Sequence, residues 1–320
     1  MKITKLSNDL SPLSKGLRFA IDGEGENLGG KIVEIIDTAK DEVVATQQLP
    51  KTTYTEVNIA PYVALLDHRT PSTSFQAGIR DAAVRSYHLR CEGIESEHIS
   101  VSVNRCDIEL PMVLTSMPLV RKMGASEHDE VVVICNPGDE ITALITANDG
   151  DEVFLNFTTE SGVAIINFSI SDFSSDVKAL DVEISCNGTI IENLHYDIVP
   201  LYRGATRVAW VAEDGAIERY TFPTSQRSQS SVKCAHLNTR EGIFAVEGES
   251  KKSISLRSRY EPQATVEQLA KIASSERVWI ESEGLMQSVE VESDALEFNL
   301  FNEPSSIVIE LCVEREEVAI

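Results

Sequence analysis

The feature that most constrains the fold is a series of short apolar segments between residues 130 and 200, each closed by turn-forming residues. They read EVVVICNPGDE, EITALITANDGDE, VFLNFTTESG, VAIINFSISDF, ALDVEISCNG and TIIENLHYDIVP. Short strands at such regular spacing are typical of an antiparallel sandwich. The turn signals are Pro137-Gly138, Gly150, Gly162 and Asn187-Gly188, and the last is the strongest two-residue hairpin signal. The sequence therefore predicts an immunoglobulin-like β-sandwich here.

Flanking segments predict two further β domains, which suits a chain of 320 residues. We expect an N-terminal β domain over 1–110, a linker and sandwich over 111–200, and a C-terminal β domain over 201–320. The proline- and methionine-containing stretch from Leu110 to Glu130 is interpreted as the interdomain connection, and the segment from Pro61 as a short helical turn. The predicted fold class is mainly β, with serial antiparallel β-sandwich domains.

One short helix is predicted in the C-terminal domain, over about 265–274. Thr265 begins a T-V-E-Q pattern that is typical of a capping box, with Gln268 as its fourth residue. An apolar stripe at helical spacing follows, and it predicts a helix that covers the sheet. The stripe consists of Val266, Leu269, Ala270, Ile272 and Ala273.

The charge balance excludes some partners. The chain has 28 Lys and Arg residues against 51 Asp and Glu residues, a net charge of −23. Such a surface repels phosphate backbones and anionic lipids, so we expect no nucleic-acid partner and no membrane partner. The N-terminus lacks the apolar core of a secretory signal, and no stretch has the length to span a bilayer. Six scattered cysteines without a CxxC motif predict reduced, mostly buried thiols. Synthesis in the cytoplasm fits these features.

No catalytic or metal-binding motif stands out. The histidines are His68, His88, His98, His128, His195 and His236, and none lies in an HExxH motif. The closest approach to a metal pair is Cys234 with His236, which the sequence alone favours as structural. The acidic loop from Asn148 to Glu152 offers oxygen atoms for calcium, but Asp, Asn and Gly also fill turns for conformational reasons. We therefore predict no catalytic residue, no cofactor and no bound metal.

A hairpin is expected where RVAWVAEDGAIERYTFP runs from Arg207 to Pro223. With a two-residue loop, Trp210 would face Arg219; with a three-residue loop and a bulge, it would face Glu218. Either register is expected to expose an acidic tip above a Trp and Tyr base. The candidates for subunit contact are accordingly Glu213, Asp214, Trp210 and Tyr220.

This hairpin carries a family resemblance. Its Trp210, Gly215, Ile217, Tyr220 and Phe222 have the spacing W-x-x-x-x-G-x-I-x-x-Y-x-F, which resembles virion structural proteins of phages and prophages of Bacteroides-type gut bacteria. In that family the loop often contains Asn, whereas this chain has Ala-Glu-Asp. The segments SPLSKGLRFAID and VNIAPYV also resemble the opening β domain of those proteins.

The resemblance implies a non-catalytic structural subunit of a phage or phage-derived particle, such as a tail, neck or baseplate component. It implies a homo-oligomer that contacts other virion proteins, located in the virion. Two alternatives remain open at this stage: a carbohydrate-binding or adhesin-type β-sandwich, with or without calcium, and a hydrolase with an unrecognised acid pair. Aromatic residues make up only 6% of the chain, which disfavours both, because sugars stack on rings.

Overall fold

The computed structural model describes residues 1–320 except 66–69, 74–75, 83, 102–104, 106–108, 174–175, 240–241, 283, 293–303 and 320. Side chains at 65, 224–227, 232–239, 242–250 and 314–319 also lie outside the description. Strands dominate, nearly all pairs are antiparallel, and short helices are few. The predicted mainly β fold class is confirmed.

The N-terminal part of the chain forms two small sheets around one core. One sheet has the order β1-β2-β5, and in the other, ordered β4-β3-β7-β8, β9 also pairs with β7. Fully buried Phe19, Ile35 and Tyr87 pack between them. The predicted helical turn is α1 (Ala60–Leu65). The other elements are β1 (Lys2–Lys5), η1 (Leu13–Lys15), β2 (Arg18–Asp22), β3 (Ile32–Asp37), β4 (Glu42–Gln48), β5 (Tyr54–Asn58), β7 (Arg85–Cys91), β8 (Ile94–Glu95) and β9 (Ile99–Val101).

The second domain is a β-sandwich, as its turn spacing predicts. Its sheets have the orders β10-β12-β15-β6 and β11-β17-β16-β13-β14. Asn187 and Gly188 join β16 to β17 with φ of 51° and 75°, which confirms the predicted tight turn. The elements are β6 (Gly78–Asp81), β10 (Met112–Leu114), β11 (Val120–Gly124), β12 (His128–Ile134), β13 (Glu140–Ala147), β14 (Glu152–Thr158), β15 (Val163–Ser169), η2 (Ile170–Asp172), β16 (Ala179–Cys186) and β17 (Thr189–Val199).

Two features of this sandwich differ from the sequence-based expectation. The stretch from Leu110 to Glu130 is not a plain connection, because it supplies β10, β11 and the start of β12. These strands are short and interrupted by proline, so their pattern is weak, and their partners come from far along the chain. In addition, β6 precedes residue 110 yet pairs with β15 of the sandwich. The chain thus enters the second domain, returns to the first, and then crosses again.

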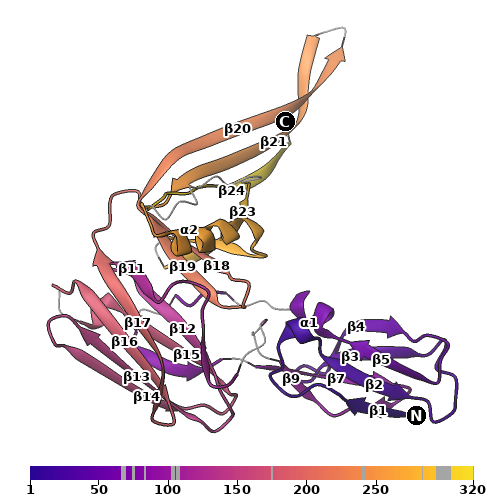
Figure 1. Cartoon of the computed structure of the whole chain (residues 1–320). Coiled ribbons are helices and arrows are strands. Elements are labelled where there is room, and N and C mark those ends of the chain that lie inside the picture. Colours follow the sequence, from indigo (N-terminus) through magenta and orange to yellow (C-terminus); the bar gives the residue numbers. More distant parts are fainter. Residues whose placement is uncertain are drawn as a thin grey trace.

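The third domain is one seven-stranded antiparallel sheet with a helix on one face (Figure 1). The strand order is β19-β18-β22-β23-β24-β21-β20. Fully buried Val266 and Leu269 of the helix pack on the sheet together with Ile272 of the 3-10 turn that follows it, in one cluster with Trp210 and Phe222. The elements are β18 (Thr206–Val211), β19 (Ile217–Phe222), β20 (Thr224–Thr239), β21 (Gly242–Arg257), α2 (Gln263–Ala270), η3 (Lys271–Ser274), β22 (Val278–Ser282), β23 (Leu285–Val291) and β24 (Val308–Ala319).

The predicted helix is confirmed, but its predicted cap is wrong. Helix α2 begins at Gln263 after Pro262, and no side chain caps it. Proline is favoured at a helix start because it has no N–H that needs a partner. Thr265 is therefore inside the first turn, where it is buried against the domain rather than capping.

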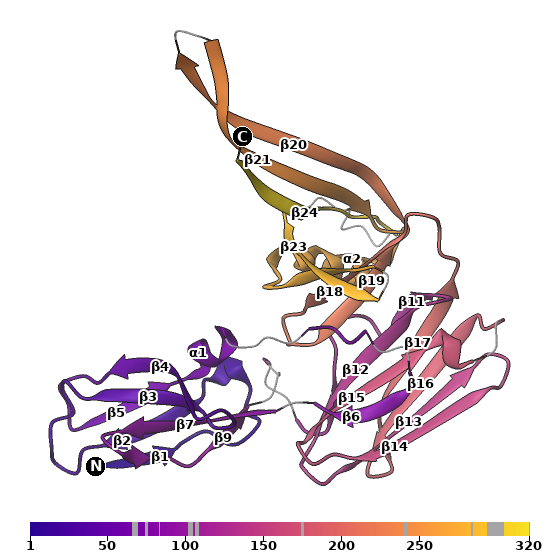
Figure 2. The same ribbon diagram turned by 180° about the vertical axis from the view of Figure 1, so that it is seen from behind.

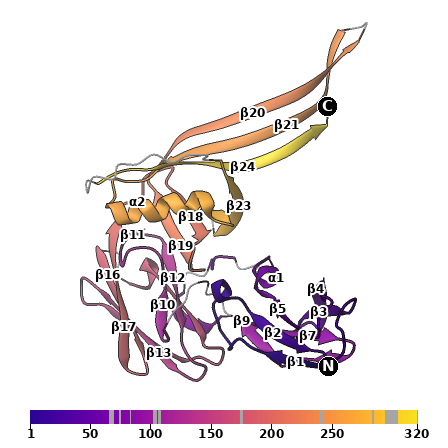
Figure 3. The ribbon, with the colours of Figure 1, turned by 45° about the vertical axis from the view of Figure 1, so that its right-hand side comes forward.

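A long arm projects from the third domain. Strands β20 and β21 each have 16 residues, and their outer halves extend with β24 beyond the helix-covered part of the sheet (Figures 1 and 2). In Figure 3 the arm leaves the molecule on the side away from the sandwich. In the view of Figure 1 the first and second domains lie side by side, and the third domain lies above the second.

Candidate functional site: the buried charge cluster between the second and third domains

The hairpin β18–β19 has the three-residue loop. Trp210 lies opposite Glu218, and Val208 lies opposite Tyr220. The amide of Gly215 donates to the carbonyl of Ala212 at 3.0 Å, and Gly215 has a φ of 94°. A positive φ at the last loop residue is the conformation for which glycine is suited. Of the two registers left open by the sequence, the structure therefore selects the one with the bulge, and Arg219 does not lie opposite Trp210.

The expectation that the whole acidic tip is exposed is wrong for Asp214. Asp214 is only 9% exposed, and its carbonyl accepts from the amide of Arg105 at 2.9 Å. The flanking Ala212 and Ala216 pack in one cluster with residues of the first two domains. The hairpin tip thus docks on its own chain, because small residues at its base let it approach the sandwich closely.

The four candidate contact residues consequently separate into two kinds. Trp210 and Tyr220 are buried in the core of the third domain, and Asp214 is buried at the tip. Only Glu213 presents its side chain to solvent, 63% exposed, where it pairs with Lys271 at 2.7 Å. A subunit-contact role for these residues stays a prediction, and Glu213 is the one with an accessible side chain.

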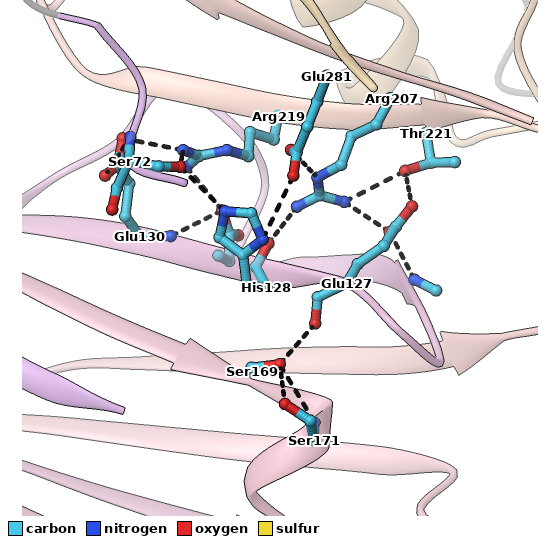
Figure 4. Close-up of polar contacts among 12 residues, drawn as sticks. Ser72, Glu127, His128, Glu130, Ser169, Ser171, Arg207, Arg219, Thr221 and Glu281 are labelled. Carbon is cyan, nitrogen blue, oxygen red and sulfur yellow. Dashed lines mark hydrogen bonds and ion pairs between the residues drawn. The ribbon is translucent and has the colours of Figure 1, made fainter. Parts of the chain in front are cut away.

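Beneath the hairpin lies a cluster of buried charges that the sequence analysis missed. It joins the sandwich strands β11 and β12 to the third-domain strands β18, β19 and β22 (Figure 4). Each of its side chains is less than a tenth exposed. We call the following residues the interdomain cluster: Arg121, Glu127, His128, Asp129, Glu130, Arg207, Glu218, Arg219 and Glu281.

Arg207 is the centre of one half of this cluster. Its guanidinium pairs with Glu127 and donates to the backbone carbonyl of His128, both from the second domain. On its own domain it donates to Thr221 at 3.2 Å and pairs with Glu281 at 3.3 Å (Figure 4). Glu127 in turn accepts from Thr221 at 2.5 Å and from the amide of Gly124 at 2.7 Å. Arg207 therefore fastens β18 to the turn before β12.

Arg219 and Glu218 are the centres of the other half. Arg219 reaches Glu130 at 3.2 Å and Asp129 at 3.6 Å, and it donates to the carbonyl of Ser72 at 2.9 Å. Glu218 accepts from the Thr115 hydroxyl at 2.6 Å and pairs with Arg121 at 3.3 Å. Two adjacent residues of β19 thus form ion pairs of opposite polarity with the sandwich: Arg219 supplies a cation and Glu218 an anion.

The electrostatics keep the Asp129 carboxylate ionised. Burial by itself would raise the pKa of Asp129, but the guanidiniums of Arg121, Arg219 and Arg207 outweigh it and lower that pKa. Burial also raises the pKa of the Tyr196 hydroxyl well above its usual range, and that hydroxyl donates to Asp129 at 3.0 Å. A tyrosine held neutral and a carboxylate held ionised serve a permanent structural contact. Neither group is poised to exchange a proton near pH 7.

A cavity of about 350 Å³ lies beside the cluster, between β11, β19 and α2. Lys122 pairs with Glu261 at 2.6 Å at its wall, and Glu261 also accepts from the Tyr220 hydroxyl at 3.0 Å. Burial, followed by the Glu261 carboxylate, raises the pKa of Tyr220 far above its usual value. Lys122, Glu261 and Tyr220 thus bond to one another across the junction, and these bonds restrict movement of the third domain against β11.

The other candidate sites from the sequence are placed as follows. Cys91, Cys135 and Cys186 are buried and free, which agrees with the expected reduced thiols, and Cys312 is also buried. The side chains of Cys234 and His236, like His68 and Cys106, lie outside the described residues. His195 lies between Asp181 at 2.6 Å and Asp197 at 3.5 Å, which raise its pKa.

In the acidic loop at 148–152, the Asn148 side-chain oxygen accepts from the amides of Lys178 and Ala179. Asp149 accepts from the amide of Asp151 at 3.2 Å. These oxygens close the turn. Among the residues with described side chains, no three His, Cys, Asp or Glu residues gather in a way that could hold a metal ion. Within the same part of the chain, no helix has the length and apolarity to cross a membrane.

Comparisons with known proteins add little. No family model matches the chain, and no curated protein matches it. Solved structures similar to it include a tetra-tandem repeat in the extending region of a large adhesion protein, 10% identical, covering 80% of this chain and 70% of that one with a TM-score of 0.20. A marsupial T cell receptor is 8% identical, covering 100% and 93%, with a TM-score of 0.21. Domains 4–9 of the surface layer protein SbsC are 9% identical, covering 99% and 46%, with a TM-score of 0.20. Scores of this size carry no argument about function.

Proposed function

We propose that the chain is a non-catalytic structural subunit of a phage or phage-derived particle, of the tail, neck or baseplate type. It acts through contacts between subunits. The observation that carries the proposal is the arm of β20, β21 and β24, which extends past its own domain instead of covering a core (Figure 3). Two 16-residue strands are about three times the usual length for a globular protein.

The interdomain cluster supports the same proposal. It fixes the third domain, and with it the base of the arm, to the sandwich through paired charges. A part that transmits force or sets the geometry of an assembly needs such a stiff joint. The residues of the virion-type resemblance serve this purpose as well, since Trp210, Tyr220 and Phe222 form the core under α2.

The direct test is whether the full-length chain assembles. We expect sedimentation velocity and negative-stain electron microscopy to show rings or tubes at micromolar concentration. Mass spectrometry of particles purified from the bacterium that carries the gene should detect the chain. A strictly monomeric protein that is absent from particles would overturn the proposal.

A variant with a shortened arm tests whether assembly depends on the arm. Residues 230–252 are replaced by Asn-Gly, which joins Gln229 to its register partner Ser253, and the chain ends after Val313. We expect this variant to keep the tryptophan fluorescence of the third domain and to lose assembly.

A glycan array tests the alternative function. Binding to the array that disappears when a calcium chelator is added would instead favour an adhesin-type module.

A further inference from the structure

The arm has an unpaired edge on each side. On one side, β20 pairs with β21 over Thr224–Thr239 and ends the strand order. On the other side, β23 pairs with β24 at Leu311 and Cys312, and its last contact along β24 is the bond from the Gln287 side chain to the carbonyl of Val313. Beyond Val313, β21 is the one neighbour of β24 among the described residues. Unpaired strand edges offer rows of backbone donors and acceptors that readily pair with another chain.

The sequences of the two edge strands differ in the sign of their charge. Strand β20 contains Arg227 and Lys233 and no Asp or Glu, in a chain of net charge −23. The outer part of β24 contains Glu314, Glu316 and Glu317 with a single Arg315. Opposite charge in the sequences of two edge strands favours pairing of unlike strands and disfavours pairing of like strands.

We propose that β20 of one copy pairs with the outer part of β24 of the next copy. The arms then form a continuous sheet across subunits. The inference rests on the proposed function. It identifies the partner as a second copy of this chain and the contact as one between β20 and β24. Because the two edges differ, the contact is heterologous, and repeated copies close into a ring or continue as a helical tube.

The strand directions suit such a ring. Both β20 and β24 are antiparallel to β21, so they run in the same direction within one arm. Copies related by a rotation would therefore pair these two strands in parallel. The outer part of β24 spans residues 314–319, and at roughly 3.3 Å per residue it supplies about 20 Å of edge.

Charge reversal on each edge tests the inference. Variant one carries Arg227→Glu and Lys233→Glu, variant two carries Glu316→Lys and Glu317→Lys, and variant three carries all four. We expect each of the first two to lose the assembled species in sedimentation velocity. The third should regain it, because the charges are again complementary, and this recovery also shows that the reversed arm folds.

Lys40→Glu with Lys51→Glu is the control. It makes the same charge change as variant one on exposed residues of the first domain, and assembly should persist. Hydrogen exchange supplies a second measurement: the β20 amides that point away from β21 should be protected in the assembled chain and unprotected in variant one.

The outcomes separate this inference from the proposed function. Assembly that survives in both single-edge variants, with the outward-facing β20 amides unprotected, would overturn the edge pairing and leave the structural role intact. A dimer that depends on β20 alone would overturn it in favour of pairing between like edges. If the chain with its natural sequence never assembles, both the edge pairing and the proposed structural role are overturned.

Discussion

At the scale of single residues, Asp214 is the least expected feature of the hairpin. Burial, with a contribution from the nearby Glu218 carboxylate, raises its pKa to about 6 despite a hydrogen bond from the amide of Ala216. An unfolded aspartate titrates near about 3.9. The folded state therefore holds the proton more tightly than the unfolded state. Stability from this group is present at low pH and is lost as the pH rises from about 4 through 6.

Asp214→Asn is expected to remove this penalty. Asparagine keeps an oxygen that accepts from Ala216 but carries no charge, so the variant should be more stable at pH 8 by roughly 1–3 kcal/mol. Urea unfolding of both proteins measures the difference, which should shrink towards zero as the pH falls to about 4. A gain that stays constant across this pH range would show that the buried charge is not the cause.

At the scale of elements, the turn between β16 and β17 shows what sequence specifies best. Gly188 has a φ of 75°, and a Cβ added there meets nothing within 4 Å. Gly188→Ala therefore measures backbone strain alone, and we expect a loss of about 1 kcal/mol in the free energy of unfolding. Gly78→Ala in β6 is the matched control, since it also has open space but no positive φ. Equal effects of the two substitutions would contradict this assignment.

How much of the fold is predictable follows from the range of the interactions involved. The strands of the sandwich, its Asn187-Gly188 turn and the stripe of α2 are local patterns, and the structure confirms them. Strand β11 was missed because its parallel partner β17 lies more than 70 residues away, and nothing local marks it. The start of α2 was misplaced because Pro262 also suits a helix start, and nothing local shows which of the two signals the chain uses.

The interdomain cluster was missed for a related reason. Arg207 and Glu127 are 80 residues apart, so their pairing has no local signature. A signal does exist, however, in charged residues that interrupt strands buried on both faces. All seven residues of β12, HDEVVVI, are buried, as are all six of β19, IERYTF. Charges in such positions indicate a partner surface, though the sequence does not identify it.

At the scale of the whole molecule, the cluster decides whether the second and third domains behave as one body. Every contact of Arg207 described above crosses or borders the junction, and its loss leaves the Glu127 and Glu281 carboxylates buried without it. Removing one partner of a buried ion pair costs about 3–5 kcal/mol, whereas exposed pairs contribute about 0–1 kcal/mol. The exposed Glu213–Lys271 pair, which lies within the third domain, is therefore a solvent-exposed comparison for the buried pairs of the cluster.

Arg207→Met is expected to lower the free energy of unfolding by about 3–5 kcal/mol, and Lys271→Met by less than about 0.5 kcal/mol. Both tryptophans, Trp210 and Trp279, belong to the third domain, so their fluorescence in urea reports on that side of the junction. Adding Glu127→Gln to Arg207→Met should recover part of the loss, because it removes one of the carboxylates left unpaired. If Arg207→Met lowers the free energy of unfolding no more than Lys271→Met does, the ion pairs do not stabilise the junction. The apolar contacts of Ala212 and Ala216 then hold the third domain on the sandwich.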